Sequence, residues 1–463
     1  MLRYFRINDP YRLLALLILM AAACLPLLID AAPATLQEIR DMVVGERIGS
    51  KVLYVDLVDR TPPLMALLDG FIHLLFGRSG LARHLVALLF LFFQAAYFAI
   101  LLINNRAYNE NTYVPSLIFG GLCFVSFDFL SLTPELFAST LMLLALNNIF
   151  KEIEFRVDRD TIVLNLGVFI GLASLVVLSY AIFLPGAILI LILFARTSLR
   201  KILLMLLGFS LVHGILFTLY YFYGHPDALW RSYYVANALQ SPGLAVSVAT
   251  LAWIGAIPVF YFLISLVMMT REARFTKYQS QIFQVLFIWL LLAVIEALFT
   301  PALAPHALIT FLPPLAYFIS HYLLLIRRRR IAEVMVWLFV AGILTVSYGT
   351  RKGLASKVDY SGLFARVSAY EETIRNKRVM VVGDDMGLYR HNSLGGGFLD
   401  WPLSQPYFEH PEYYEHVIRM DNAFAEDPPD AIVDEANMMP AVFERLPAVR
   451  RNYQKEGVIY WRK

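Results

Sequence analysis

Charged residues are scarce in this sequence. Only 16% of its 463 residues are Asp, Glu, Lys or Arg, and 59% are hydrophobic, whereas about 25% of residues are charged in an ordinary soluble domain. So many apolar side chains cannot all be buried in one water-soluble core. The composition therefore excludes a soluble enzyme and a disordered chain, and it predicts a polytopic membrane protein.

Cysteine is also scarce, and the net charge is small. Cys24 and Cys123 both lie inside apolar runs, so we expect neither a disulfide nor a metal site from them. A net charge of +3 is too small to indicate a nucleic-acid-binding protein. No cofactor is indicated, and although a divalent metal is compatible with the sequence, no pattern points to one.

The charges that are present gather near the C-terminal end. Residues 349–463 are about 28% charged, whereas the first 348 residues are about 12% charged. This step predicts a transmembrane domain over residues 1–348, with a long extracytoplasmic first loop at about 30–80, and a soluble domain over residues 349–463.

Long apolar runs are abundant. A membrane-spanning helix needs about 20 apolar residues. The first run, 13–29, lacks a small-residue cleavage site and is followed by many others, so it is an anchored helix rather than a signal peptide. The other runs lie at 81–103, 113–130, 134–149, 162–180, 183–195, 202–223, 247–270, 282–300, 308–326 and 331–348. We therefore expect about eleven transmembrane helices, with 183–195 the shortest.

Basic residues set the expected orientation. With a cytoplasmic N-terminus, the inner loops hold Arg106, Lys151, Arg156, Arg159, Arg196, Arg200, Lys201, Arg271, Arg274, Lys277 and Arg327 to Arg330. The connections at 131–133, 181–185 and 301–307 contain no Lys or Arg. The positive-inside rule then places the C-terminal domain on the extracytoplasmic side of a bacterial inner membrane.

A polar stretch at residues 49–64 follows the first helix. It leads through Pro62 and Pro63 into an apolar segment at 64–76, which suits a helix lying in the membrane interface. A carboxylate held there can act as a base toward an acceptor hydroxyl, because the low dielectric raises its pKa.

This stretch carries a family resemblance. The run YVDLVDRTPPL at 54–64, followed by LFGRSGLARHL at 75–85, resembles the first outer loop of GT-C membrane glycosyltransferases. The closest branch contains the protein O-mannosyltransferases and the lipid A aminoarabinose transferase. The resemblance implies a GT-C-like helical fold and an acidic catalytic residue in this loop. It also implies a sugar donor linked to polyprenyl phosphate, used on the outer face of the membrane.

One departure from that family concerns the acidic residues. Family members carry an adjacent acidic pair directly after the first helix, and this chain has none. Glu38 is our candidate for the missing acid or base, and Asp56 is the alternative. A loop carboxylate that is solvated or ion-paired, for instance Asp59 with Arg60, is the competing interpretation, and a non-catalytic relative stays open.

A second acidic group lies at the turn near residues 128–135. In the resembling family an acidic residue here lies beside the catalytic loop, which makes Asp128 and Glu135 substrate-binding candidates. Thr133-Pro134-Glu135 is also typical of a helix start, with a capping residue, a first-turn proline and a first-turn acid. Glu296 and His306 form a third, weaker candidate on the same side.

A phosphate-bearing substrate needs cationic partners. The candidates are Arg60, Arg78, Arg83, Arg231 and His225. Arg231 is the best of them, because it is the only Lys or Arg in the loop at 224–246. Its aromatic neighbours suit either a membrane-interface belt or a sugar-stacking surface.

Residues 349–463 predict a small α/β domain. Strands are expected at 377–383, 431–434 and 458–461, and a helix is expected at 438–446. Gly395–Gly397 is expected to be a mobile loop. The aromatic residues that follow could pack the domain, or bind glycan or an envelope protein partner.

Three functions compete. The first is a glycosyltransferase that moves a sugar from a polyprenyl-phosphate carrier to an envelope glycan, lipid or protein. The second is a non-catalytic scaffold of GT-C-like fold that anchors an outer domain in an envelope assembly. A transporter is disfavoured, because the sequence has no internal repeat and few charges in the middle of its spans.

Overall fold

The structure is a computed structural model that describes residues 1–30, 32–154, 160–195, 197–272, 275–352 and 358–463. Arg156, Arg159, Arg196 and Arg274, which entered the orientation argument, lie outside these ranges. The chain forms two compact units. The helical unit comprises Met1–Ala32, Gly80–Leu216 and Ser241–Gly362, and the mixed unit comprises Pro33–Ser79, Phe217–Gln240 and Leu363–Lys463.

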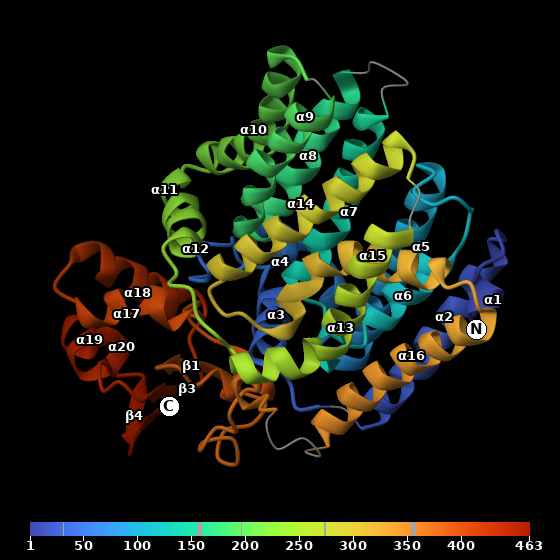
Figure 1. Ribbon diagram of the computed structural model, residues 1–463. Coiled ribbons are helices and arrows are strands. Elements are labelled where there is room, and N and C mark those ends of the chain that lie inside the picture. Colours follow the sequence, from blue (N-terminus) through green and yellow to red (C-terminus); the bar gives the residue numbers. More distant parts are fainter. Residues whose placement is uncertain (31, 155–159, 196, 273–274, 353–357) are drawn as a thin grey trace. The chain divides into compact units, whose positions relative to one another are not determined.

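Within the described residues, nine helical segments are long and apolar enough to cross a membrane. Seven are single helices, labelled in Figure 1: α2 (Tyr11–Ile29), α5 (Gly80–Asn104), α7 (Pro134–Ile153), α10 (Leu199–Phe222), α13 (Val248–Glu272), α14 (Lys277–Phe299) and α16 (Arg329–Arg351). Two combine a short helix with a longer one: η2 (Leu178–Ile182) with α9 (Phe183–Ala195), and η4 (Pro305–Phe311) with α15 (Leu312–Leu325). The chain is a multi-pass membrane protein.

Two of the predicted spans are shorter in the structure. The run at 113–130 is divided into α6 (Val114–Leu122) and η1 (Phe127–Leu130). Nine helical residues extend only about 14 Å at 1.5 Å each, less than half the hydrocarbon thickness. The second is the run expected at 162–180, where the helix α8 (Asp160–Val176) has 17 residues. The chain then enters η2, and η2 together with α9 makes the span expected at 183–195 longer than predicted.

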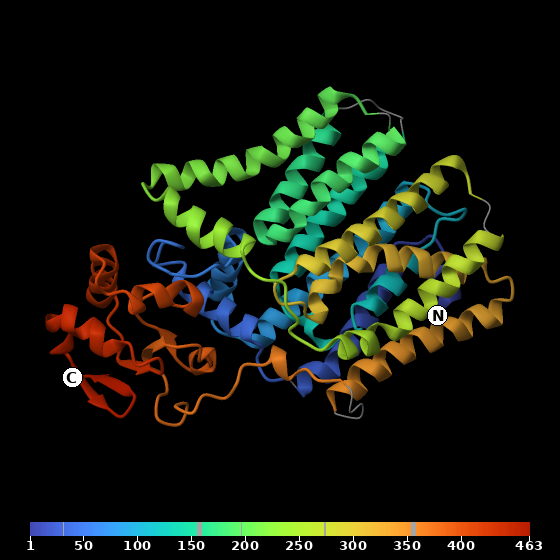
Figure 2. The ribbon, with the colours of Figure 1, turned by 60° about the vertical axis from the view of Figure 1, so that its left-hand side comes forward.

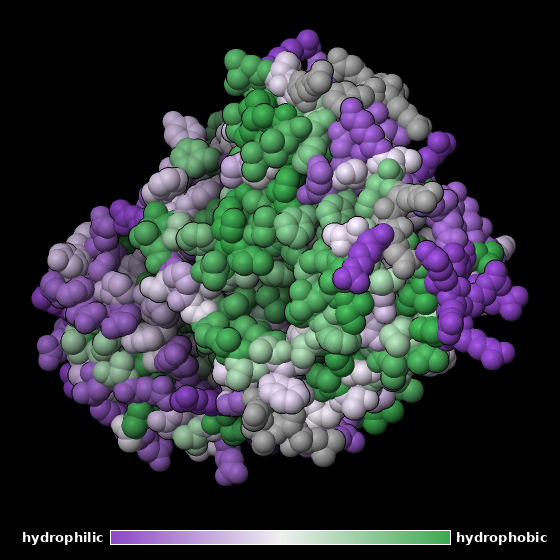
Figure 3. Space-filling model, in the orientation of Figure 1, coloured by the Kyte–Doolittle hydropathy of each residue, from purple (hydrophilic) through white to green (hydrophobic). Residues whose placement is uncertain are grey.

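The helices of the helical unit differ in how much they are buried. Side chains of α7 and of the η4–α15 segment are mostly buried, whereas few side chains of α2, α10 and α13 are buried. Apolar side chains cover much of the face seen in Figure 3. Gly167 of α8 and Gly208 of α10 let their helices approach closely, because a Cβ atom at Gly167 would lie 2.0 Å from the Met205 carbonyl oxygen.

The mixed unit contains a five-stranded sheet of order β2-β1-β3-β5-β4. The strands are β1 (Arg378–Val382), β2 (Ser393–Leu394), β3 (Ala431–Asp434), β4 (Tyr453–Glu456) and β5 (Ile459–Arg462). β1 pairs in parallel with β2 and β3, and β4 and β5 form the antiparallel hairpin drawn in red beside the C-terminus in Figure 2. The three predicted strands are confirmed, but β2 and β4 were missed because one is only two residues long and the other is mostly polar and exposed.

Helices cover this sheet. They are α17 (Trp401–Glu409), α18 (Tyr414–Glu426), α19 (Met439–Arg445) and α20 (Pro447–Arg450). α19 confirms the helix predicted at 438–446.

The first loop packs into the same unit as the C-terminal segment. It contributes α3 (Leu36–Arg47) and α4 (Pro63–Phe76), and the buried side chain of Val58 belongs to the same core cluster as Met380 and Phe398. The Val58 backbone donates a hydrogen bond to the Gly397 carbonyl oxygen at 2.7 Å and accepts one from Leu399 at 3.2 Å. A short helical stretch, α11 (Pro226–Leu229), η3 (Trp230–Val235) and α12 (Ala236–Ala238), completes the unit.

The mobile loop expected at Gly395–Gly397 is instead packed and hydrogen-bonded. The Gly395 N–H donates to the Val379 carbonyl oxygen at 2.8 Å, and the Gly396 N–H donates to that of Asp427 at 3.0 Å. At Gly397 the backbone has φ +78°, and a Cβ atom would lie 2.1 Å from the Asp56 carbonyl oxygen. The glycine is therefore required for close contact with the first loop.

Candidate functional site

A buried charge cluster occupies the mixed unit. Arg60 binds Asp400 through two hydrogen bonds, Nε to Oδ2 and Nη2 to Oδ1, both 2.6 Å long. Arg40 lies 3.2 Å from Asp400 and 3.8 Å from Asp59. Both carboxylate side chains are fully buried, so the two acids and two arginines compensate one another away from water.

Local structure explains how these side chains meet. Arg40 projects from α3, and Asp400 caps α17 by accepting the Leu403 N–H at 3.2 Å. Asp59 accepts hydrogen bonds from the backbone and hydroxyl of Thr61, in the turn that leads into α4. The expected pairing of Asp59 with Arg60 is wrong: neighbours in an extended segment point to opposite sides, so each finds a partner elsewhere.

The environment of Asp59 shifts its pKa. Burial raises the pKa of Asp59, and the negative charge of Asp400 adds to the rise, whereas Arg40 and the Thr61 hydrogen bonds oppose it. Since the folded pKa lies above the unfolded value of about 3.9, protonated Asp59 favours the fold below that value. This contribution is lost as the pH rises through the folded pKa.

Measuring the stability of the protein as a function of pH tests the direction of this pKa shift. We expect the melting temperature of the purified protein, relative to that of Asp59→Asn, to fall as the pH rises from about 4 toward neutrality. The asparagine variant removes the titrating group and keeps the shape of the side chain. Parallel pH profiles for the two proteins would contradict the raised pKa.

Glu38 and Asp56, the first-loop candidates for catalysis, both bind backbone groups. Glu38 completes a capping box at the start of α3, accepting the Thr35 N–H at 2.9 Å while Thr35 accepts the Glu38 N–H at 3.2 Å. Asp56 accepts the Val52 N–H at 2.8 Å in a tight turn. Each carboxylate therefore has a local structural role, and a catalytic role for either stays a prediction.

That turn contains a strained residue. Tyr54 has φ +68° and is fully buried, an unusual combination for an aromatic residue. Its hydroxyl donates to the Thr61 carbonyl oxygen at 2.6 Å. Arg419 of α18 donates to the carbonyl oxygens of Tyr54 and Val55 at 3.0 and 2.8 Å, which holds the strained backbone in place.

A second polar cluster lies in the helical unit. Asp128 of η1 accepts two hydrogen bonds through one oxygen, from the backbone of His306 at 2.9 Å and from its ring Nδ1 at 3.0 Å. The other ring nitrogen, Nε2, lies 3.7 Å from a carboxylate oxygen of Glu135. Asp128 thus orients an imidazole whose second nitrogen faces another acid.

The side chains of this cluster come from the beginnings of helices and from short helical turns. Thr133 caps α7 and Pro134 occupies its first turn, which confirms the predicted helix start and places Glu135 at its beginning. His306 belongs to η4, two residues after Ala304. Asp128, Glu135 and His306 were each singled out in the sequence, but the placement of the two acids on either side of the imidazole could not be predicted.

Glu296, near the end of α14, extends the polar region. One of its oxygens accepts hydrogen bonds from Ser179 at 2.8 Å and Thr300 at 3.0 Å. Within the described chain, the other oxygen of Glu296, the Oε2 atom of Glu135 and the hydroxyl of Tyr180 are buried without a hydrogen-bond partner. Unsatisfied buried polar atoms are costly, so a group that supplied hydrogen-bond partners to these three atoms would be bound favourably.

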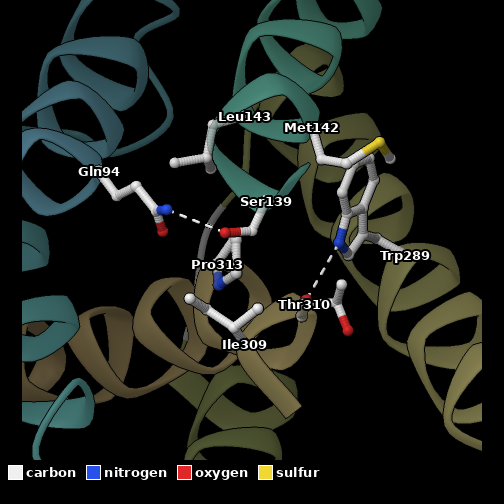
Figure 4. Close-up of a pocket in the computed structure, with 8 residues that line it drawn as sticks. All are labelled: Gln94, Ser139, Met142, Leu143, Trp289, Ile309, Thr310 and Pro313. Atoms are coloured by element: carbon white, nitrogen blue, oxygen red, sulfur yellow. Dashed lines mark hydrogen bonds between the residues drawn. The ribbon is translucent and has the colours of Figure 1, made fainter. Parts of the chain in front are cut away.

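Deeper in the same unit, a small cavity lies between Gln94, Ser139, Trp289 and Thr310 (Figure 4). Gln94 donates to Ser139 at 2.9 Å and the Trp289 ring N–H donates to the Thr310 carbonyl oxygen at 3.2 Å. Its volume of about 10 Å³ accommodates roughly one water molecule.

The basic candidates are dispersed. Arg231 and His225 are exposed, Arg83 is buried, and Arg78 pairs with Glu46 at 2.9 Å. Arg60 is already neutralised by Asp400. Among the residues that the structure describes, no group of three or more His, Cys, Asp or Glu side chains is arranged to hold a metal ion.

Comparison with known proteins identifies the fold. No family model matches the sequence, and no curated protein matches it either. A solved structure does: the crystal structure of ArnT from Cupriavidus metallidurans bound to undecaprenyl phosphate, at 12% identity and a TM-score of 0.53, covering 92% of this chain and 94% of that one. The fold is that of the GT-C membrane glycosyltransferases.

A second GT-C structure is also similar. The apo oligosaccharyltransferase of Archaeoglobus fulgidus has 12% identity and a TM-score of 0.48, with 96% of this chain and 73% of that chain covered. The predicted fold class, a GT-C-like helical membrane protein with a small C-terminal α/β part, is thereby confirmed by the ArnT match.

Proposed function

We propose that the protein is a membrane glycosyltransferase. It takes a sugar from a polyprenyl-phosphate carrier and passes it to an envelope glycan, lipid or protein at the extracytoplasmic face of the bacterial inner membrane. The N-terminus is cytoplasmic in this proposal. The GT-C fold supports it, because the matched ArnT structure holds undecaprenyl phosphate.

The observation that carries the proposal is the imidazole of His306 between two carboxylates. Asp128 accepts a hydrogen bond from Nδ1–H, which fixes the tautomer and orientation of the ring so that Nε2 is the nitrogen that acts as the base. The acceptor hydroxyl attacks the anomeric carbon while its proton passes to Nε2. The bond between that carbon and the phosphate oxygen breaks, and polyprenyl phosphate leaves with the electron pair. Glu135 stabilises the imidazolium that forms.

The other site predictions keep the status of predictions. Arg60, Arg231 and His225 are candidates for the phosphate, and Glu38 and Asp56 are alternatives for the acid or base. An envelope protein partner for residues 349–463 is a further prediction.

A scaffold function also has a specific observation in its favour. The first-loop acid Asp59 is ion-paired with Arg40, as expected for a loop whose charges stabilise the fold. A scaffold of GT-C fold would need no base. Substitution of the acids around His306 therefore distinguishes the two functions.

Complementation of a deletion strain tests the proposal. We expect the deletion to remove one envelope glycan, and we expect Asp128→Asn and Glu135→Gln, at normal protein levels, to leave it missing. Asp421→Asn and Glu415→Gln, which change exposed acids of α18, should restore it. Restoration by all four variants would favour the scaffold, and an unchanged glycan profile in the deletion strain would refute the transferase.

A further inference from the structure

The polar atoms beside His306 that lack partners point to a ligand. We propose that Glu296, Tyr180 and Glu135 form a subsite for the hydroxyl groups of the transferred sugar. This inference rests on the proposed function and assigns the substrate-recognition part of the same site.

Three polar groups line this region. Glu296 is 2% exposed and Tyr180 is fully buried, whereas the Glu135 side chain is 18% exposed. Ser179, the chain neighbour of Tyr180, donates to Glu296 at 2.8 Å, and η4, which carries His306, packs against both α7 and α14. The tyrosine and the two acids therefore lie on elements that meet beside His306.

Only one of the two carboxylate oxygens of Glu296 is hydrogen-bonded within the described chain. Ser179 and Thr300 both donate to Oε1 and leave Oε2 as an acceptor without a donor. Tyr180 presents a hydroxyl without a hydrogen-bond partner in the described chain, and Oε2 of Glu135 lies 3.7 Å from Nε2 of His306. The region thus offers carboxylate acceptors and a hydroxyl that can donate or accept, which is the complement of a polyol.

A sugar fits this chemistry better than an anion or an apolar chain. Its hydroxyls supply donors to the carboxylate oxygens without adding charge, whereas a phosphate would be repelled by Glu135 and Glu296. A series of aromatic rings begins at Tyr180. Tyr180 packs against Phe183 at 5.8 Å between ring centroids, and Phe183 packs against Trp289 at 4.8 Å. Trp289 also lines the small cavity of Figure 4, so free volume adjoins the aromatic series.

The test compares carriers with and without a sugar. Full-length protein in lipid nanodiscs is titrated, by native mass spectrometry, with undecaprenyl phosphate and with undecaprenyl phosphate bearing glucose, galactose or mannose. We expect the wild type to bind its preferred sugar-bearing carrier about 10-fold more tightly than the bare carrier, which corresponds to about 1.4 kcal/mol. Tyr180→Phe and Glu296→Gln should abolish most of that preference and leave the affinity for the bare carrier unchanged.

Tyr317→Phe is the matched control. It also deletes a buried hydroxyl without a hydrogen-bond partner in the described chain, but on α15 next to Tyr108, and it should keep the preference. A preference unchanged in both Tyr180→Phe and Glu296→Gln would overturn the subsite, as would a wild type that binds all four carriers equally. A wild type that binds none of the four would overturn the proposed function itself.

Discussion

We expect the replacement of His306 by alanine to lower the rate of the proposed sugar transfer by about 100- to 10,000-fold, the usual contribution of a general base. The reason is geometric. Asp128 holds the imidazole through both the ring and the backbone of His306, so the alanine variant loses a base whose position is fixed. The rate is measured as the reappearance of the envelope glycan after induction of the variant in the deletion strain.

A control and a second variant make this result specific. His410→Ala removes an exposed histidine that pairs with Glu412 in the mixed unit, and it should transfer at the wild-type rate. Asp128→Asn keeps the shape of the site but loses the charge that orients the ring, so its rate should also fall. Wild-type transfer by His306→Ala, with normal protein levels, would rule out His306 as the base.

We expect the replacement of Asp400 by alanine to lower the free energy of unfolding of the mixed unit by about 3–5 kcal/mol, the typical cost of breaking a buried ion pair. Asp400 is the partner of both Arg40 and Arg60. Its loss leaves Arg40 with the carboxylate of Asp59 and removes the carboxylate partner of Arg60. Denaturant titration in detergent, followed by tryptophan fluorescence, measures the change because Trp401 adjoins the deleted carboxylate in sequence.

A double variant that also replaces Arg60 separates the effect of the unpaired charge from the effect of lost packing. In the double variant Arg60→Leu, Asp400→Leu the unpaired charge of Arg60 is gone, so the loss should be smaller than the sum of the two single losses. Asp421→Asn, an exposed acid of α18, should change stability by less than about 0.5 kcal/mol. Additive losses in the double variant would show that the two side chains do not act as a pair.

Features set by short stretches of sequence could be predicted. The apolar runs gave the membrane-spanning segments, and Thr133-Pro134-Glu135 gave the start of α7, because capping depends on residues within one turn. The buried strand β1 and the helix α19 followed from local patterns in the same way. The division of the run at 113–130 could not be predicted, because apolar composition persists through the break between α6 and η1.

Features set by distant residues could not be predicted. The pairing of Asp59 and Arg60 was expected from adjacency, whereas their partners come from α3 and from α17. His306 was only a weak candidate, because its significance depends on Asp128, which lies 178 positions earlier in the chain. Glu38 is a different case: Thr35 and Glu38 have the spacing of a capping box within one turn, so its structural role was readable from the local sequence and was missed because the family resemblance favoured catalysis.

The hydrogen bonds from Arg419 to the turn that contains Tyr54 have a consequence for biosynthesis. The hydrogen bond to Tyr54 joins residues 365 positions apart, so the ribosome must synthesise the chain through α18 before this bond can form. Until then the positive φ of Tyr54 is supported only by local contacts such as the hydrogen bond of its hydroxyl to Thr61. A nascent chain that stops short of α18 would therefore lack the contact that fixes this turn, which makes α18 a checkpoint for folding of the first loop.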